Sequence, residues 1–106
     1  MASALTTSTQ DDKRPPAELV VERRLRALFD CLPTLAGFRV RTDHMVSNVR
    51  AVSFTGSQAI RRLHVNVMRA LVELAECDPQ AVALMPGRTF ERPPEGERHV
   101  EMRFSN

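Results

Sequence analysis

The order of the hydrophobic periodicities along the chain constrains its fold more strongly than any other feature. Two segments, at about 16–32 and 57–76, repeat apolar residues every three or four positions, which is the spacing of an amphipathic helix. Each is followed by two segments in which apolar and polar residues alternate, and this alternation is typical of strands with one buried face. The sequence therefore predicts helix, hairpin, helix and hairpin in that order.

The first predicted helix carries an apolar stripe made of Val21, Leu25, Leu28, Phe29 and Leu32. We expect Pro33 to end this helix, because the residue before a proline is pushed out of the α region.

The second predicted helix is the clearest element, and its apolar stripe contains Ile60, Leu63, His64, Val67, Leu71, Leu74 and Ala75. Val65 and Val72 widen the apolar arc, which predicts that this helix packs on more than one neighbour. Asp78 and Pro79 follow it. An N-cap residue followed by proline at the first helical position predicts a short helical turn through about Leu84.

The first predicted hairpin has strands at 38–42 and 47–54, each within two residues, joined by a turn at Asp43 and His44. We expect Val52 and Phe54 on the buried face of the second strand. By simple alternation, however, Asn48 and Arg50 fall on that same face. A β-bulge, or a strand longer than the sheet, would explain this conflict.

The second predicted hairpin has strands at 88–92 and 98–104, joined by a loop at 93–97. Its last strand is expected to turn Val100, Met102 and Phe104 toward the core. The phenylalanines of the strand segments that fit the buried phase are Phe38, Phe54, Phe90 and Phe104.

These elements predict an α+β fold in which a two-layer sandwich has a mainly antiparallel four-stranded sheet with two helices on one face. The full order is α-β-β-α-(short α)-β-β. The chain has 106 residues, which is too few for two ordinary cores, so residues 15–106 are predicted to form a single domain. Residues 1–14 are rich in Ser and Thr and are predicted to form a disordered tail.

Several classes of protein are excluded or disfavoured. No apolar run approaches the ~18 residues needed to span a bilayer. The first ten residues lack the basic and apolar regions of a secretory signal, so we expect a cytoplasmic protein with reduced cysteines. Cys31 and Cys77 are expected to be small buried or half-buried apolar residues, because no C-x-x-C spacing supports a metal or redox role.

Charge is distributed unevenly along the chain. Residues 38–69 contain six arginines and one aspartate, whereas residues 70–101 contain three arginines and seven carboxylates. A GC-rich coding sequence could account for the preference for arginine over lysine. Alternatively, arginine suits bidentate contacts with phosphates or carboxylates. The candidate polyanion-binding residues are Arg39, Arg41, Arg50, Arg61, Arg62 and Arg69.

Thr55, Gly56 and Ser57 precede the second predicted helix and form a second candidate site. Backbone N–H groups at a helix N-terminus can hold a phosphate or carboxylate, and Arg61 and Arg62 lie in the next turns. Ordinary capping by these residues, with outward arginines, is the simpler interpretation. The segment matches neither a Walker A motif nor a dinucleotide fingerprint.

No catalytic or metal-binding arrangement is predicted. His44, His64 and His99 have no ligand neighbours at metal spacing, and His64 is expected at the edge of the core. Neither a cofactor nor a membrane partner is expected, and enzymatic activity is disfavoured.

The sequence thus favours a small interaction module that binds a protein partner or associates with itself through its sheet. The alternative is a nucleic-acid binder without sequence specificity that uses the six arginines. No aromatic residue is expected on the uncovered sheet face, which disfavours base stacking and leaves only charge-based contacts with nucleic acid.

Overall fold

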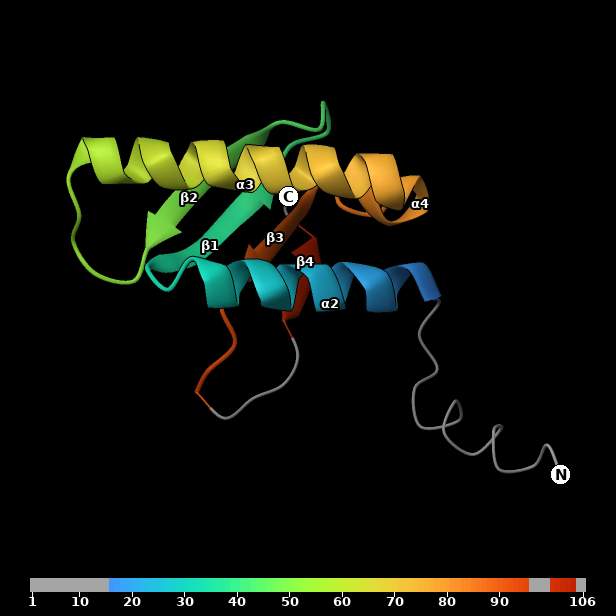
Figure 1. Ribbon diagram of the computed structural model, residues 1–106, viewed down its shortest axis with the longest axis horizontal. Helices are drawn as coiled ribbons and strands as arrows, with labels where there is room; N and C mark the ends of the chain where they lie inside the picture. Colours follow the sequence, from blue (N-terminus) through green and yellow to red (C-terminus); the bar gives the residue numbers. More distant parts are fainter. Residues whose placement is uncertain (1–15, 96–99, 105–106) are drawn as a thin grey trace, which may run out of the picture.

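The computed structural model describes residues 16–95 and 100–104, and it has the predicted α+β architecture. The elements are α2 (Pro16–Cys31), β1 (Leu35–Val40), β2 (Val46–Ala51), α3 (Ser57–Cys77), α4 (Pro79–Val82), β3 (Arg88–Glu91) and β4 (Glu101–Phe104). The four strands form an antiparallel sheet in the order β2-β1-β3-β4. Helices α2 and α3 lie side by side across one face of this sheet (Figure 1). The predicted tail at 1–14 lies outside the described residues.

Both long helices follow the predicted periodicity. Helix α2 buries Val21, Leu25 and Phe29, and it ends two residues before Pro33, as expected from the proline's steric restriction. Helix α3 buries the residues that share its inner face, which are Leu63, Val67, Leu71 and Leu74. These inner faces supply the helical half of the core.

The first strand lies three residues earlier than predicted at its start and two residues earlier at its end. Strand β1 begins at Leu35, while Arg41 and Thr42 belong to the turn that follows it. In this turn the Arg41 N–H donates to the Met45 carbonyl at 2.8 Å, and His44 adopts a φ of 66°. The turn predicted at Asp43 and His44 is therefore confirmed.

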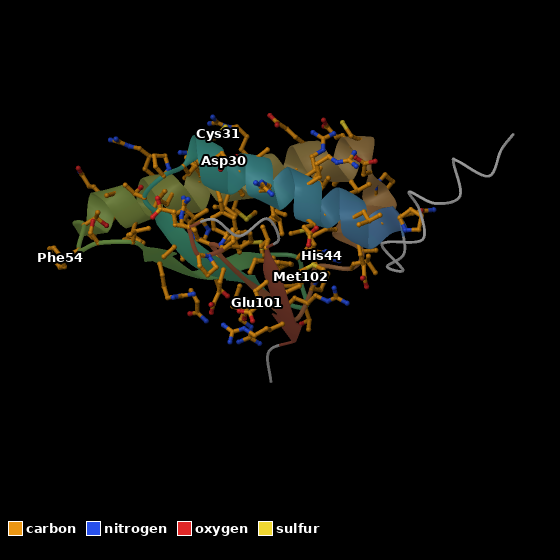
Figure 2. All side chains as sticks on the ribbon, turned by 90° about the horizontal axis from the view of Figure 1, so that it is seen from below. Asp30, Cys31, His44, Phe54, Glu101 and Met102 are labelled. Atoms are coloured by element: carbon orange, nitrogen blue, oxygen red, sulfur yellow. The ribbon has the colours of Figure 1, made fainter. Side chains whose placement is uncertain are left out.

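Strand β2 contains a β-bulge, and the placement of Phe54 in the core was wrong. Asn48 has a φ of 51°, and the register between β1 and β2 shifts at this point. The extra residue reverses the alternation, so Val49 and Ala51 pack against the core although they are only partly buried. The strand ends at Ala51, and Phe54 is 98% exposed in the connection to α3 (Figure 2).

Three aromatic rings fill the centre of the core. The centroids of Phe29 and Phe38 are 6.2 Å apart, and those of Phe38 and Phe90 are 5.4 Å apart. All three rings are buried. The core positions predicted for Phe38 and Phe90 are thus confirmed, whereas the side chain of Phe104 lies outside the described part of the structure.

Arg92 links the end of α2 to the sheet through side-chain hydrogen bonds. Its Nε donates to the Leu35 carbonyl at 2.8 Å, and its Nη2 donates to the carbonyls of Phe29 and Leu32 at 2.7 and 2.6 Å. The guanidinium carbon also lies 5.4 Å from the centroid of the Phe29 ring. A cation at the carboxyl end of a helix satisfies carbonyls that lack helical partners and complements the helix dipole.

We predict that Arg92→Ala lowers the free energy of unfolding by about 2 to 3 kcal/mol, because it leaves carbonyls without their charged donor. Urea denaturation monitored by circular dichroism measures this effect. Arg23→Ala, on the exposed side of α2, serves as the control and should change stability by less than about 0.5 kcal/mol. Equal losses of stability in the two variants would show that Arg92 does not stabilise the contact between α2 and the sheet.

A second pair of substitutions compares the buried Phe38 of β1 with the exposed Phe54, which alternation alone had placed in the core. Phe38→Ala should cost about 3 to 5 kcal/mol, because it opens a cavity among buried rings. Phe54→Ala should leave stability within about 0.5 kcal/mol of the parent, since Phe54 is 98% exposed. A large loss of stability for Phe54→Ala would contradict the bulge at Asn48.

Candidate functional site

One face of the sheet is covered by helices, and we call the other the open face. Its side chains come from alternate positions of β1, β3 and β4 and from both sides of the bulge in β2, and they project away from the helical layer (Figure 2). The residues of the open face are Gly37, Arg39, Ser47, Arg50, Thr89, Glu91, Glu101 and Arg103. It is the strongest candidate site because five of these eight residues are charged.

Gly37 allows a side chain from the edge strand to reach the middle of the sheet. Arg50 on β2 pairs with Gly37 on β1, and Gly37 pairs in turn with Glu91 on β3. A Cβ at position 37 would lie 2.5 Å from Nη2 of Arg50 and 2.9 Å from the Phe90 carbonyl oxygen. The Arg50 guanidinium therefore occupies the space that a side chain on β1 would fill.

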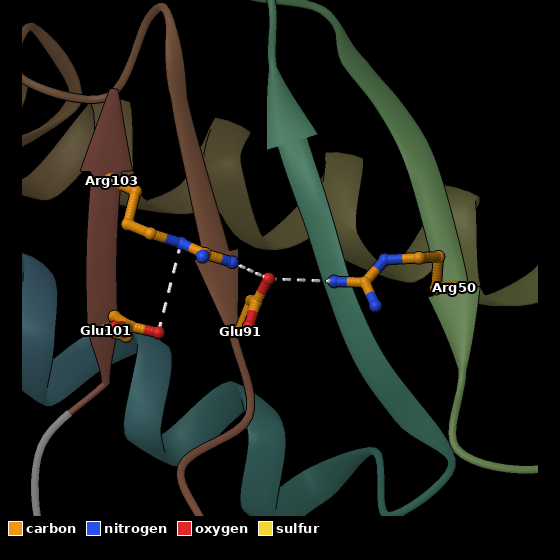
Figure 3. Close-up of polar contacts among 4 residues, drawn as sticks. All are labelled: Arg50, Glu91, Glu101 and Arg103. Carbon is orange, nitrogen blue, oxygen red and sulfur yellow. Dashed lines mark hydrogen bonds and ion pairs between the residues drawn. The ribbon is translucent and has the colours of Figure 1, made fainter. Parts of the chain in front are cut away.

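Glu91 is shared by two arginines that come from opposite edges of the sheet (Figure 3). Its Oε2 lies 3.4 Å from Nη2 of Arg50, and the same oxygen pairs with Nη2 of Arg103 on β4. Nε of Arg103 also lies 3.8 Å from Oε1 of Glu101. One ionic network therefore spans the sheet from β2 to β4.

Arg39 lies in the neighbouring row of the open face, between Ser47 and Thr89. Its Nε is shielded from solvent and has no hydrogen-bond partner among the residues that the structure describes. No ion pair joins Arg39 to a carboxylate within residues 16–95 and 100–104. Together with Arg50 and Glu91 it lines a hollow, which also includes Phe38, Asn48, Val49 and Thr89.

The structure divides the six arginines predicted to bind a polyanion between two layers. Arg39 lies on the open face, as expected for the uncovered side of the sheet. Arg50 also lies there, because the bulge at Asn48 reverses the alternation that would have placed it on the buried face. Arg41 lies beyond the end of β1 and pairs with Asp43 at 3.1 Å. The remaining three are exposed on α3, which covers the opposite face of the sheet, and they are Arg61, Arg62 and Arg69.

The segment before α3 provides a backbone cap. Gly56 is the N-cap residue and makes no side-chain hydrogen bond, while its carbonyl accepts from the N–H groups of Ala59 and Ile60 at 3.0 and 3.2 Å. The cap chemistry predicted from Thr55 and Ser57 is therefore not used. The Thr55 hydroxyl is buried, and no residue in the described part of the chain hydrogen-bonds to it.

The other candidate residues are scattered. His44 lies in the turn after β1, His64 is half-buried on α3, and His99 lies outside the described residues. Cys31 and Cys77 are exposed at helix ends, beyond the last buried position of each helix, so the expectation that they are buried or half-buried was wrong. Where the chain is described, no three His, Cys, Asp or Glu side chains are grouped so as to hold a metal ion.

Comparison with protein-family models, with curated proteins and with solved structures finds no match to this chain. Among the helices within the described ranges, none is long and apolar enough to cross a membrane.

Sequence reasoning did not identify Gly37, Glu91 or Arg103 as part of the site. Arg103 and Glu91 are in phase with the outer face of their strands, so alternation could have placed them there. Their meeting with Arg50 depends on the strand order, because β2 and β3 are neighbours of β1 on opposite sides. The position of Gly37 opposite both Arg50 and Glu91 likewise follows only from the register.

We predict that Gly37→Ala lowers the free energy of unfolding by about 1 to 3 kcal/mol, because the added methyl displaces Arg50 and presses on the Phe90 carbonyl. Chemical denaturation measures the loss. In an Arg50→Ala background, the same substitution should cost less, since only the backbone contact remains. Identical costs in the two backgrounds would show that Arg50 does not cross over Gly37.

Proposed function

We propose that the chain is a non-enzymatic, cytoplasmic interaction module that binds an acidic segment of a protein partner on the open face. The observation that carries this proposal is the imbalance of charge on that face. Three arginines stand beside two glutamates, and Arg39 has no carboxylate partner within the described ranges. A carboxylate from outside the chain would supply this missing partner.

Two of the three arginines are well exposed, whereas Arg39 is half-buried in the neighbouring row. The side chains of Arg50 and Arg103 are 53% and 51% exposed, whereas Glu91 between them is 32% exposed. Each guanidinium has more N–H donors than its contacts with Glu91 use, and it can accept a second carboxylate in a bidentate arrangement. An acidic segment can therefore bind along the network without first breaking it.

Nucleic acid is the alternative ligand for the same arginines, and two features favour protein over it. The rings of Phe38 and Phe90 are fully buried beneath the face, so they cannot stack on bases. The arginines of α3 lie in the other layer and cannot extend the open face into one continuous basic surface.

The proposal is tested by titrating the labelled chain with a hexaglutamate peptide while recording amide chemical shifts at about 0.15 M salt. We expect the largest amide shifts at the open-face positions around Gly37, Arg39 and Arg50. Glu91→Gln should strengthen peptide binding about two- to five-fold, because it releases two arginines from their internal partner. Glu73→Gln makes the same change in net charge on α3 and should leave the affinity unchanged.

A parallel titration uses a mixed-sequence oligonucleotide with the same formal charge as the hexaglutamate peptide. Tighter binding of the oligonucleotide than of the peptide, with a steep decrease as salt is added, would establish the nucleic-acid alternative. Peptide-induced shifts confined to Arg61, Arg62 and Arg69 would place the binding surface on α3 and overturn the proposal.

A further inference from the structure

Helix α3 has a second apolar stripe, in which two valines are exposed and Met68 is half-buried against β2. We call it the α3 seam, and it consists of Val65, Met68, Val72 and Ala75. Val65 and Val72 are 53% and 55% exposed, and both were expected to meet a further neighbour. Successive seam residues are three or four positions apart, which is the spacing at which the side chains of two paired helices interdigitate.

The seam faces away from α2. The side of α3 that turns toward α2 contributes Ala70 and Glu73 to the groove between the two helices. On the opposite side, Met68, Val72 and Ala75 line a groove with Val40, His44, Leu71, Val82 and Met85. Met68 also lies over the edge strand β2, because its sulfur accepts from the Val46 N–H at 3.4 Å. In Figure 1, the turn between β1 and β2 projects past α3 on this side, and the short helix α4 lies at the C-terminal end of α3.

Charges at the two ends of the seam are opposite in sign. Arg61 lies four residues before Val65, and Glu76 lies four residues after Val72. Both end residues are exposed. In an antiparallel pair of α3 helices centred between Met68 and Arg69, Val65 of one copy meets Val72 of the other. The same register places Arg61 opposite Glu76 at both ends.

We propose that two copies of this chain associate through antiparallel pairing of their α3 seams. A two-fold axis makes the contact self-complementary, because each ion pair and each valine pair occurs twice. Parallel pairing would instead place Arg61 against Arg61. The charge pattern therefore favours a second copy of the chain, in antiparallel orientation, as the partner that covers the seam.

The size of the helix sets the expected strength of the association. The 21 residues of α3 extend about 30 Å, and a single helix pair buries at most about 1,200 Å². Interfaces of this size are weak, so we expect a monomer–dimer equilibrium in the micromolar range. This contact is independent of the open face, which lies in the other layer and stays accessible in the dimer.

The association is tested by sedimentation velocity of the full chain between about 5 and 500 μM. We expect the weight-average mass to rise from monomer to dimer across this range. Val65→Asp combined with Val72→Asp should abolish the dimer. Because both valines are exposed, the circular dichroism spectrum and melting temperature of this variant should stay close to those of the parent chain.

Charge reversal tests the antiparallel register. Arg61→Glu or Glu76→Arg alone should weaken association about ten-fold, because each creates two like-charged contacts per dimer. The double variant Arg61→Glu with Glu76→Arg should restore it, since the pairs re-form with opposite sign. Arg23→Glu on α2 is the control and should leave association unchanged.

Two results would overturn this inference. One is a monomer at every concentration up to about 500 μM. The other is a dimer that persists in the Val65→Asp, Val72→Asp variant, or whose single charge reversals are not rescued by the double reversal. Either result leaves the proposal for the open face standing, because the binding of hexaglutamate is measured on a different layer of the molecule.

Discussion

The side chain of Arg92 makes the contact on which the arrangement of the two layers depends most. It joins the last carbonyls of α2 to Leu35 at the start of β1, while its own backbone N–H donates to the Ala36 carbonyl at 2.8 Å. One residue at the end of β3 thus fixes where a helix ends and where a central strand begins. Gly37 and Arg39 follow directly on that strand, so the positions of the open-face residues depend on this junction.

A sheet covered on one side only presents half of its side chains to solvent, and local backbone features decide which ones. The bulge at Asn48 turns Arg50 outward, and the absence of a side chain at Gly37 lets Arg50 reach Glu91. Because Arg103 approaches the same carboxylate from β4, three strands contribute charge to one network. The rings of Phe38 and Phe90 are buried beneath this surface and the arginines of α3 lie in the other layer, which is why we propose a protein partner rather than nucleic acid.

The sequence was sufficient to predict the parts of the structure that depend on regular periodicity. The end of α2 near Pro33, the bounds of α3 and the four-stranded antiparallel sheet follow from local spacing and from the need to bury one face of each element. The error at Phe54 arose where alternation was continued through Asn48. A bulge had been weighed there, but a single inserted residue cannot be located by alternation alone.

The candidate site was only partly predictable for a related reason. Arg39 could be assigned to the open face from the alternation in β1. Arg50 reaches that face only through the bulge in β2, and the three arginines of α3 belong to the helical layer. Proximity in the chain had grouped residues that the fold separates. Conversely, Arg50 and Arg103 are far apart in the sequence and meet at Glu91 through strand order, which no local pattern encodes.

The most direct test of this account is the set of nuclear Overhauser contacts made by the Arg50 side chain in the free protein. With the bulge in β2, we expect contacts from the δ and ε protons of Arg50 to the α protons of Gly37. We also expect contacts from the Val49 methyls to the core. Contacts from Arg50 to residues of α3, with Val49 facing solvent, would show that β2 has no bulge. The network on the open face could then not exist.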